Sequence, residues 1–275
     1  MKQKLIFSLV ALLTLIVFSS HNLYIKLKSF HLKPDTATAI YLYNGTFEKS
    51  EAIVARNRIS DVSLINPGEK AIHPDASMWF EENNQTVLKI KTGKEGTGLL
   101  GVSTLPKVGD FTAKSFADNM KHEGLLHILE ARKKSGEDTK PAKKKYAKYV
   151  KTIFQVGTIQ TEDFKTILNH PIELIPINNP YTLKPGDSLS MKLLIEGNPA
   201  SGEMVYAGYA GHQGKSKDGL PHDAFQLKTN TKGIVKIKIS KAGHWYFRSV
   251  HVTKSKEQDA DYISNTASIT FEIKN

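Results

Sequence analysis

The chain has 275 residues, of which 40% are hydrophobic and 24% charged, and its formal net charge is +11 at pH 7. This length allows about two globular domains with sizeable cores. The sequence contains no cysteine, which excludes disulfide cross-links and a lipoprotein anchor. No recognised nucleic-acid-binding motif accompanies the positive charge, so no nucleic-acid partner is expected.

The first 20 residues have the pattern of a secretory signal peptide. Lys2 and Lys4 precede an apolar run from Leu5 to Phe18, and the small residues Ser19 and Ser20 follow. The run is shorter than the roughly 20 apolar residues that cross a bilayer comfortably. We therefore expect a periplasmic or secreted protein, with an uncleaved N-terminal membrane anchor as the alternative.

Two stretches of the chain repeat each other at a constant offset of 147 residues (234 minus 87). Val87–Thr104 begins V-L-K-I-K-T-G-K-E-G, and Ile234–His251 begins I-V-K-I-K-I-S-K-A-G. In both, apolar residues alternate with lysines as in a half-buried strand, and a Lys-x-Gly turn predicts a hairpin. Leu-Lys-Pro recurs in the same way within Phe30–Gly45 and Tyr181–Gly197. Repeats this far apart indicate two copies of a domain rather than a solenoid, whose repeats are about 20–50 residues long.

Short strands separated by Gly, Pro and Asn turns predict a mainly β, antiparallel fold. We expect two tandem immunoglobulin-like β-sandwich domains, over residues 21–110 and 158–275. A helical insert over residues 111–157 is expected between them.

The expected insert contains two helix-like patterns joined by a charged loop. Ala113–Lys134 places apolar residues among polar ones at helical spacing, and Lys133–Lys145 forms the loop. From Tyr146 to Phe154, aromatic and aliphatic residues then recur at i, i+3, i+4, i+7 and i+8, which predicts an amphipathic helix. The K-P-A-K-K-K run at residues 140–145 is interpreted as a solvated surface.

Four strings in the sequence resemble a known family. They are Y-L-Y-N-G-T-F-E-K-S-E at Tyr41–Glu51, P-A-K-K-K-Y-A-K-Y-V-K at Pro141–Lys151, N-P-Y-T-L-K-P-G-D at Asn179–Asp187, and D-Y-I-S-N-T-A-S-I-T-F-E-I at Asp261–Ile273. Together, over nearly the whole mature chain, they resemble exported bacterial proteins classed as a domain of unknown function. Relatives of that family are described as additional periplasmic components of nickel/cobalt uptake systems. The resemblance therefore implies a role in divalent metal uptake, with membrane transporter components as partners.

The same family begins with a His-Asp pair and an aromatic residue after the signal cleavage point. The matching residues here are His21, Asn22 and Tyr24, so Asn22 removes a possible carboxylate ligand. If cleavage falls between Ser20 and His21, the free α-amino group and the imidazole can chelate one metal ion together. Cleavage after Ser19 leaves Ser20 in front and weakens this chelate. The alternative is that His21 is simply the first residue of an edge strand.

Further histidines lie in the second copy. His212 and His222 flank a Gly/Lys-rich loop, and His244 and His251 lie on an aromatic strand. Alternation along that strand puts His244 and His251 on opposite faces. We expect His212, His222 and His251 to be metal ligands together with His21, and His244 to be a surface or packing residue. The alternative is a structural role for each, since no H-x-H or H-E-x-x-H spacing occurs.

No motif in the sequence indicates an enzyme. A G-x-S-x-G elbow, a P-loop and a cysteine nucleophile are all missing. We expect a non-enzymatic metal-binding or accessory protein for uptake of nickel or cobalt; imidazole ligands also suit copper and zinc. The alternative is an envelope interaction module that binds a polymer or a membrane transporter without metal.

Overall fold

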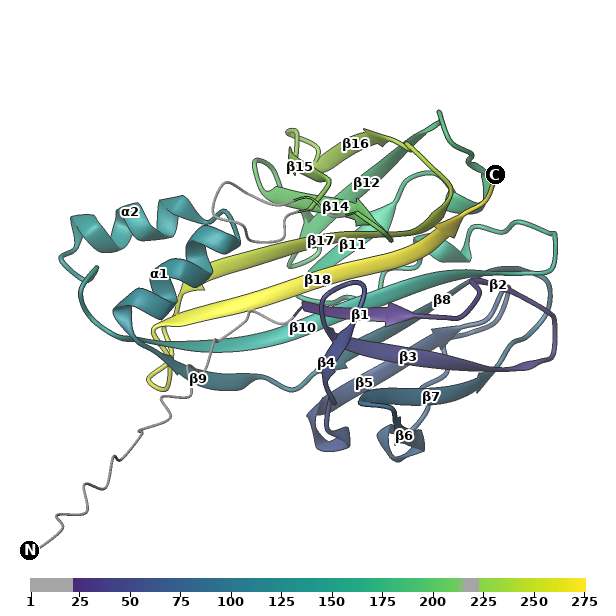
Figure 1. Cartoon of the computed structure of the whole chain (residues 1–275), viewed down its shortest axis with the longest axis horizontal. Helices are drawn as coiled ribbons and strands as arrows, with labels where there is room; N and C mark the ends of the chain where they lie inside the picture. Colours follow the sequence, from purple (N-terminus) through teal and green to yellow (C-terminus); the bar gives the residue numbers. More distant parts are fainter. Residues whose placement is uncertain (1–21, 213, 215–222) are drawn as a thin grey trace, which may run out of the picture.

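The computed structural model of the chain describes residues 22–212, 214 and 223–275 (Figure 1). Strands dominate the described residues, and the predicted mainly β fold with antiparallel sandwich sheets is confirmed. The expected signal peptide at residues 1–20, together with His21 and His222, lies outside the described residues.

The described strands form three sheets. The five-stranded sheet contains β1 (Asn22–Lys26), β3 (Ala37–Gly45), β4 (Ser50–Ala52), β6 (Trp79–Glu82) and β7 (Gln85–Lys91). The four-stranded sheet contains β11 (Ile172–Pro176), β12 (Ser188–Ile195), β13 (Asn198–Pro199) and β16 (Ile234–Lys238). The nine-stranded sheet contains β2 (His31–Leu32), β5 (Ile59–Ile65), β8 (Gly96–Thr104), β9 (Lys107–Phe111), β10 (Ala142–Val156), β14 (Met204–Tyr209), β15 (Phe225–Lys228), β17 (Gly243–Lys254) and β18 (Tyr262–Ile273).

Short helical segments complete the described structure. The α-helices are α1 (Ala113–His122) and α2 (Leu126–Lys134). The 3-10 turns are η1 (Arg56–Arg58), η2 (Ala76–Met78), η3 (Asp163–Lys165) and η4 (Pro180–Thr182). In the described part of the chain, no helix is long and apolar enough to cross a membrane.

The nine-stranded sheet is shared by both halves of the chain. Its middle is the parallel pair of β10 and β18, in register from Lys144 opposite Tyr262 to Thr152 opposite Thr270. Outward from this pair, β8 and β5 on one side correspond to β17 and β14 on the other. The two long strands run side by side through the centre of the molecule in Figure 1. The two sandwiches therefore meet within one continuous sheet.

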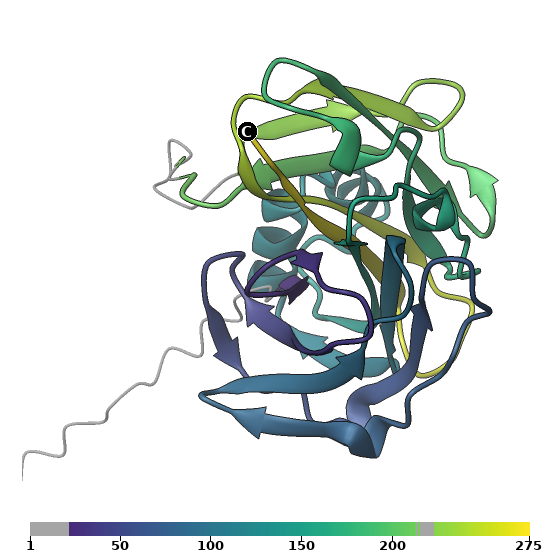
Figure 2. The same ribbon diagram turned by 90° about the vertical axis from the view of Figure 1, so that its right-hand side faces the viewer.

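Adjacent residues of β10 belong to different hydrophobic cores. Ile153 packs with Trp245 and Phe247 in one core, whereas Phe154 packs with Trp79 in the other. Successive side chains of a strand point to opposite faces of the sheet. The five-stranded and four-stranded sheets consequently cover opposite faces of the nine-stranded sheet, as Figure 2 shows. We call these faces the N-side face and the C-side face, respectively.

The repeated Lys-x-Gly segments are turns between sheets rather than hairpins. β7 belongs to the five-stranded sheet and β8 to the nine-stranded sheet, and β16 and β17 are divided in the same way. The prediction of a hairpin is therefore wrong, because alternation identifies a strand but not its pairing partner. Gly96 is required at the first of these turns: its φ is 149°, and a Cβ there would lie 2.3 Å from Pro67.

The predicted helix from Tyr146 to Phe154 is wrong, because these residues lie in β10. β10 is covered on both faces, so apolar side chains occupy both and the two-residue alternation disappears. Its Tyr, Val, Thr, Ile and Phe residues are typical of strands. The interpretation of residues 140–145 as a solvated run is also incorrect at Lys144, which is only 8% exposed.

The helix-like pattern over Ala113–Lys134 is confirmed as two helices, α1 and α2. The chain turns between them at Gly124, whose φ is 69° and whose missing Cβ leaves room for the Tyr206 hydroxyl. Phe116 and Met120 of α1 pack against Val250 and Tyr262. The helices therefore cover the end of β17 and β18 on the N-side face.

Candidate functional site

A buried guanidinium marks the most unusual site on the N-side face. Arg248 of β17 is 3% exposed, and its Nη1 donates to Glu123 Oε2 at 2.6 Å. Its Nη2 and Nε donate to the two oxygens of Asp223 at 2.7 and 3.2 Å. Burial alone lowers the pKa of Arg248, but the two carboxylates outweigh it and raise the pKa well above its usual value. We call Arg248, Glu123 and Asp223 the charged cluster.

Tyrosines surround the charged cluster. The Tyr246 hydroxyl donates to Asp223 Oδ1 at 2.7 Å, and the Tyr206 hydroxyl donates to the Glu123 carbonyl at 2.7 Å. The Tyr206 ring centre lies 4.3 Å from Arg248 Cζ, within the range of a cation–π contact. These contacts connect the end of α1, the end of the loop after β14, and β17.

An aromatic cluster of Tyr24, Phe47 and Tyr246 adjoins the charged cluster. The Tyr24 ring lies 5.2 Å from Phe47 and 5.1 Å from Tyr246, and Phe47 lies 4.6 Å from Tyr246. Burial raises the pKa of Tyr24, so its hydroxyl stays protonated at neutral pH. Next to Phe47, the Glu48 carboxylate accepts a hydrogen bond from the Gly211 amide at 2.7 Å. The aromatic cluster thus includes one residue of β1, Tyr24, and it lies beside the loop that follows β14.

Two lysines of β10 also point to the N-side face. Lys144 Nζ donates to Asn119 Oδ1 at 2.5 Å, and Lys148 Nζ donates to Asn44 Oδ1 at 3.4 Å. Burial lowers the pKa of each lysine to about 8, and Glu123 opposes the shift in both. The two ammonium groups are therefore partly deprotonated in mildly alkaline solution.

The lowered pKa values predict that alkaline pH stabilises the fold. Both pKa values lie below the 10.5 of an unfolded lysine, so the folded chain binds fewer protons and the free energy of unfolding rises between pH 8 and 10.5. Above pH 10, Tyr24 and Tyr246 act in the opposite direction, because burial raises their pKa values. We expect each lysine to add about 2 kcal/mol between pH 7.5 and 9.5, and the pair about 4 kcal/mol. Urea unfolding at the two pH values measures it.

The control for this prediction is a pair of substitutions, Lys144→Met and Lys148→Met. Each removes one titrating amine, and the double variant is expected to lose the part of the pH dependence that these two lysines contribute; Lys26 and Lys151, whose pKa values burial also lowers, remain. A flat profile in the unchanged protein, or an unchanged slope in the double variant, contradicts the assignment to these lysines.

The predicted metal ligands do not come together within the described residues. His251 faces the C-side, where its Nδ1 lies 3.4 Å from Glu203 Oε1. The His212 ring packs 5.5 Å from Tyr209, and Tyr209 pairs with Trp245. Trp245 and His251 are six positions apart along β17, roughly 20 Å, so His212 and His251 cannot hold one ion. No three His, Cys, Asp or Glu side chains among the described residues gather closely enough to bind a metal.

His244 has the position that the sequence predicted for it. The pairing of β17 with β18 is continuous from Gly243 to Lys254, so His244 and His251 point to opposite faces. The His244 ring packs 4.9 Å from Phe30, which confirms a packing residue. Burial lowers the pKa of His244, and Glu272 partly opposes this. His244 is neutral at physiological pH.

Sequence reasoning missed the charged cluster. One signal was available: Arg248 is the only charged residue in the aromatic run H-W-Y-F-R-S-V-H. An arginine inside a strand with this much apolar surface requires buried carboxylate partners. Its partner Glu123 is 125 residues away in the sequence, and no local pattern points to it.

Comparisons with known proteins bear on the family but not on the activity. Residues 18–253 match a family model described as a domain of unknown function, DUF4198. A search of curated proteins found no significant match.

Several solved structures resemble the chain weakly. The D0-D1 domain of intimin is 12% identical with a TM-score of 0.21, covering 90% of this chain and 96% of that one. Salmonella alpha-2-macroglobulin reacted with methylamine is 11% identical with a TM-score of 0.24, covering 92% and 15%. The human OSCAR ligand-binding domain is 9% identical with a TM-score of 0.22, covering 93% and 100%. None of these similarities is close enough to bear on function.

The family match, in contrast, extends from the end of the expected signal peptide almost to the end of β17. It therefore covers the helices, the charged cluster and every described strand except β18. This chain belongs to the DUF4198 family, a domain of unknown function.

Proposed function

We propose that this chain is an exported, non-enzymatic protein that binds a divalent transition metal ion, nickel or cobalt, for uptake by a membrane transporter. The main support is that three separate chain segments meet around the aromatic cluster. β1 reaches it through Tyr24, and the end of the β14 loop reaches it through Asp223, which binds Tyr246. The start of that loop approaches the aromatic cluster at Gly211, whose amide donates a hydrogen bond to Glu48, the residue after Phe47.

Two of the expected ligands are next to these anchors in the sequence, and a third is close to one. His21 precedes Asn22, the first residue of β1; His212 follows Gly211; and His222 precedes Asp223. Consecutive Cα atoms are about 3.8 Å apart, so His212 and His222 are each one peptide unit from an anchor, whereas His21 is three residues before Tyr24. His251, on the C-side face, is not part of the proposed ligand set.

The proposed ligands have suitable chemistry for this ion. Neutral imidazoles, and a free α-amino group on His21 after signal cleavage, are nitrogen ligands that suit nickel and also copper and zinc. These groups must lose their protons to bind, so metal binding weakens as pH falls below about 6.

Calorimetric titration of the mature protein with nickel, cobalt, copper and zinc salts tests the proposal. We expect a Kd below millimolar. Replacing His21, His212 or His222 with Ala is expected to weaken binding about tenfold or more. His251→Ala is the matched control and leaves the affinity unchanged. Placing one extra residue before His21 isolates the contribution of the α-amino group.

Two outcomes contradict the metal proposal. One is the absence of binding below about millimolar, and the other is an equal loss of affinity in His251→Ala and His21→Ala. Capture of envelope components that persists in chelator favours the alternative, an interaction module that works without metal. Mass measurement of the N-terminus of the exported protein checks the signal cleavage on which the His21 chelate depends.

A further inference from the structure

The outer face of the four-stranded sheet carries a row of lysines. Lys236 and Lys238 of β16 are exposed while the residues between and beside them are buried. β16 pairs with β12 so that Lys236 lies opposite Ser190 and Lys192 lies opposite Ile234. Residues paired in this way share a face, so Lys192, Lys236 and Lys238 point outward together. Neither strand contains an Asp or Glu.

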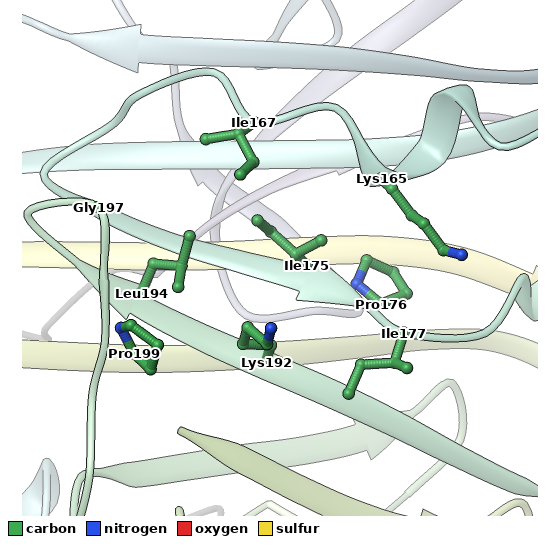
Figure 3. A pocket seen from close by; sticks show the side chains of 9 residues that line it. All are labelled: Lys165, Ile167, Ile175, Pro176, Ile177, Lys192, Leu194, Gly197 and Pro199. Carbon is green, nitrogen blue, oxygen red and sulfur yellow. The ribbon is translucent and has the colours of Figure 1, made fainter. Parts of the chain in front are cut away.

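The lysine row leads into an apolar groove of about 390 Å³. Figure 3 shows the groove between the outer face of β11 and β12 and the loop that precedes β11. Its apolar lining comprises Ile167, Ile175, Pro176, Ile177, Leu194 and Pro199, and Lys165 and Lys192 stand at its sides. Ile167 and Ile177 are 50% and 38% exposed, which is unusual for large aliphatic side chains in one place.

The loop before β11, which forms one wall of this groove, is held in place by contacts with the rest of the protein. The Leu168 amide donates to Glu173 Oε1 at 2.8 Å, and the same oxygen accepts from Lys151 Nζ at 2.8 Å. The Leu168 side chain fills the space over Gly101, where a Cβ would lie 2.1 Å away. The loop that carries Ile167 is therefore held against the protein, and the groove is already formed.

We infer that the groove and the lysine row together bind an extended, acidic segment of a partner protein with aliphatic side chains. The aliphatic side chains would fill the apolar groove, and the carboxylates would meet Lys192, Lys236 and Lys238, which form no ion pair with the described residues; Lys165 already pairs with Glu162. An extended chain suits this surface because an aliphatic stretch can lie over the groove while an adjoining acidic stretch follows the lysine row on the same face. A phosphate polymer has no aliphatic groups to fill the groove, and a lipid surface requires protruding rather than recessed apolar side chains. This binding is independent of the metal proposal.

Fluorescence anisotropy with a labelled synthetic peptide that joins a Leu-rich stretch to a Glu-rich stretch, the Glu–Leu peptide, tests the inference on the full mature chain. We expect saturable binding that weakens with salt, and no binding of the corresponding Lys–Leu peptide. Lys236→Glu is expected to weaken binding about fivefold, and Ile177→Asp about tenfold. Both positions are on the surface, and circular dichroism confirms that the variants fold.

The repeat provides a matched control. Lys89→Glu makes the same charge change at the position equivalent to Lys236, on β7 of the other sandwich, and is expected to leave binding unchanged. Equal losses in Lys89→Glu and Lys236→Glu overturn the inference, because they indicate a general charge effect. Failure of the Glu–Leu peptide to bind also overturns it, as does binding to phosphatidylglycerol vesicles in place of the peptide.

Discussion

Replacing Arg248 with Met is expected to lower the free energy of unfolding by about 3–5 kcal/mol. The substitution keeps most of the side-chain volume but leaves the carboxylates of Glu123 and Asp223 buried without their guanidinium. Both carboxylates are at most 7% exposed, so water cannot replace the lost partner. Urea denaturation with linear extrapolation measures the change.

Two further variants make this prediction specific. Arg56→Met changes an exposed arginine of η1 and is expected to alter stability by less than about 0.5 kcal/mol. Adding Asp223→Asn to Arg248→Met removes one stranded charge and is expected to recover part of the loss. A loss below about 1 kcal/mol in Arg248→Met contradicts the picture of a buried, fully paired cluster.

Replacing Phe154 with Ala is expected to cost about 3–5 kcal/mol and to shift a single unfolding transition of the whole chain. Phe154 is fully buried in the core beneath the five-stranded sheet, and its neighbour Ile153 is fully buried in the opposite core. Ile153→Ala is expected to cost about 2–5 kcal/mol and to shift the same transition. One strand serves both cores, so neither sandwich can unfold while the other keeps β10 in place.

Scanning calorimetry distinguishes this behaviour from two independent domains. For a single cooperative unit, the calorimetric and van't Hoff enthalpies agree in the unchanged protein and in both variants. Appearance of a second transition in Phe154→Ala, with the C-terminal sandwich still folded, contradicts the prediction.

The fold could be predicted where one face of a strand is solvated. Val235 and Ile237 of β16 alternate with exposed lysines, and this alternation made both the strand and its repeat visible in the sequence. In β10 the same reasoning failed, because seven consecutive residues from Val150 to Val156 are all buried. A strand inside a shared sheet loses its alternation, and its remaining apolar spacing resembled a helix.

The candidate site could be predicted only in part. Alternation correctly separated His244 from His251, because it depends on neighbouring residues alone. The contacts of Arg248 depend instead on how the end of α1 and Asp223 fold over β17. Grouping His251 with His212 failed for the same reason. The distance between these histidines depends on the pairing of β14 with β17, which places Tyr209 beside Trp245 and so puts His212 far along β17 from His251.

The central position of β18 has a consequence for the order in which the chain folds. β18 is the last strand in the sequence, yet it lies between β17 and β10 and pairs with both along most of its length. During synthesis, the sheet that joins the two sandwiches cannot close until β18 has been made. Long-range pairing of this kind forms slowly. A nascent chain therefore stays incompletely folded until β18 has been made and has paired with both of its neighbours.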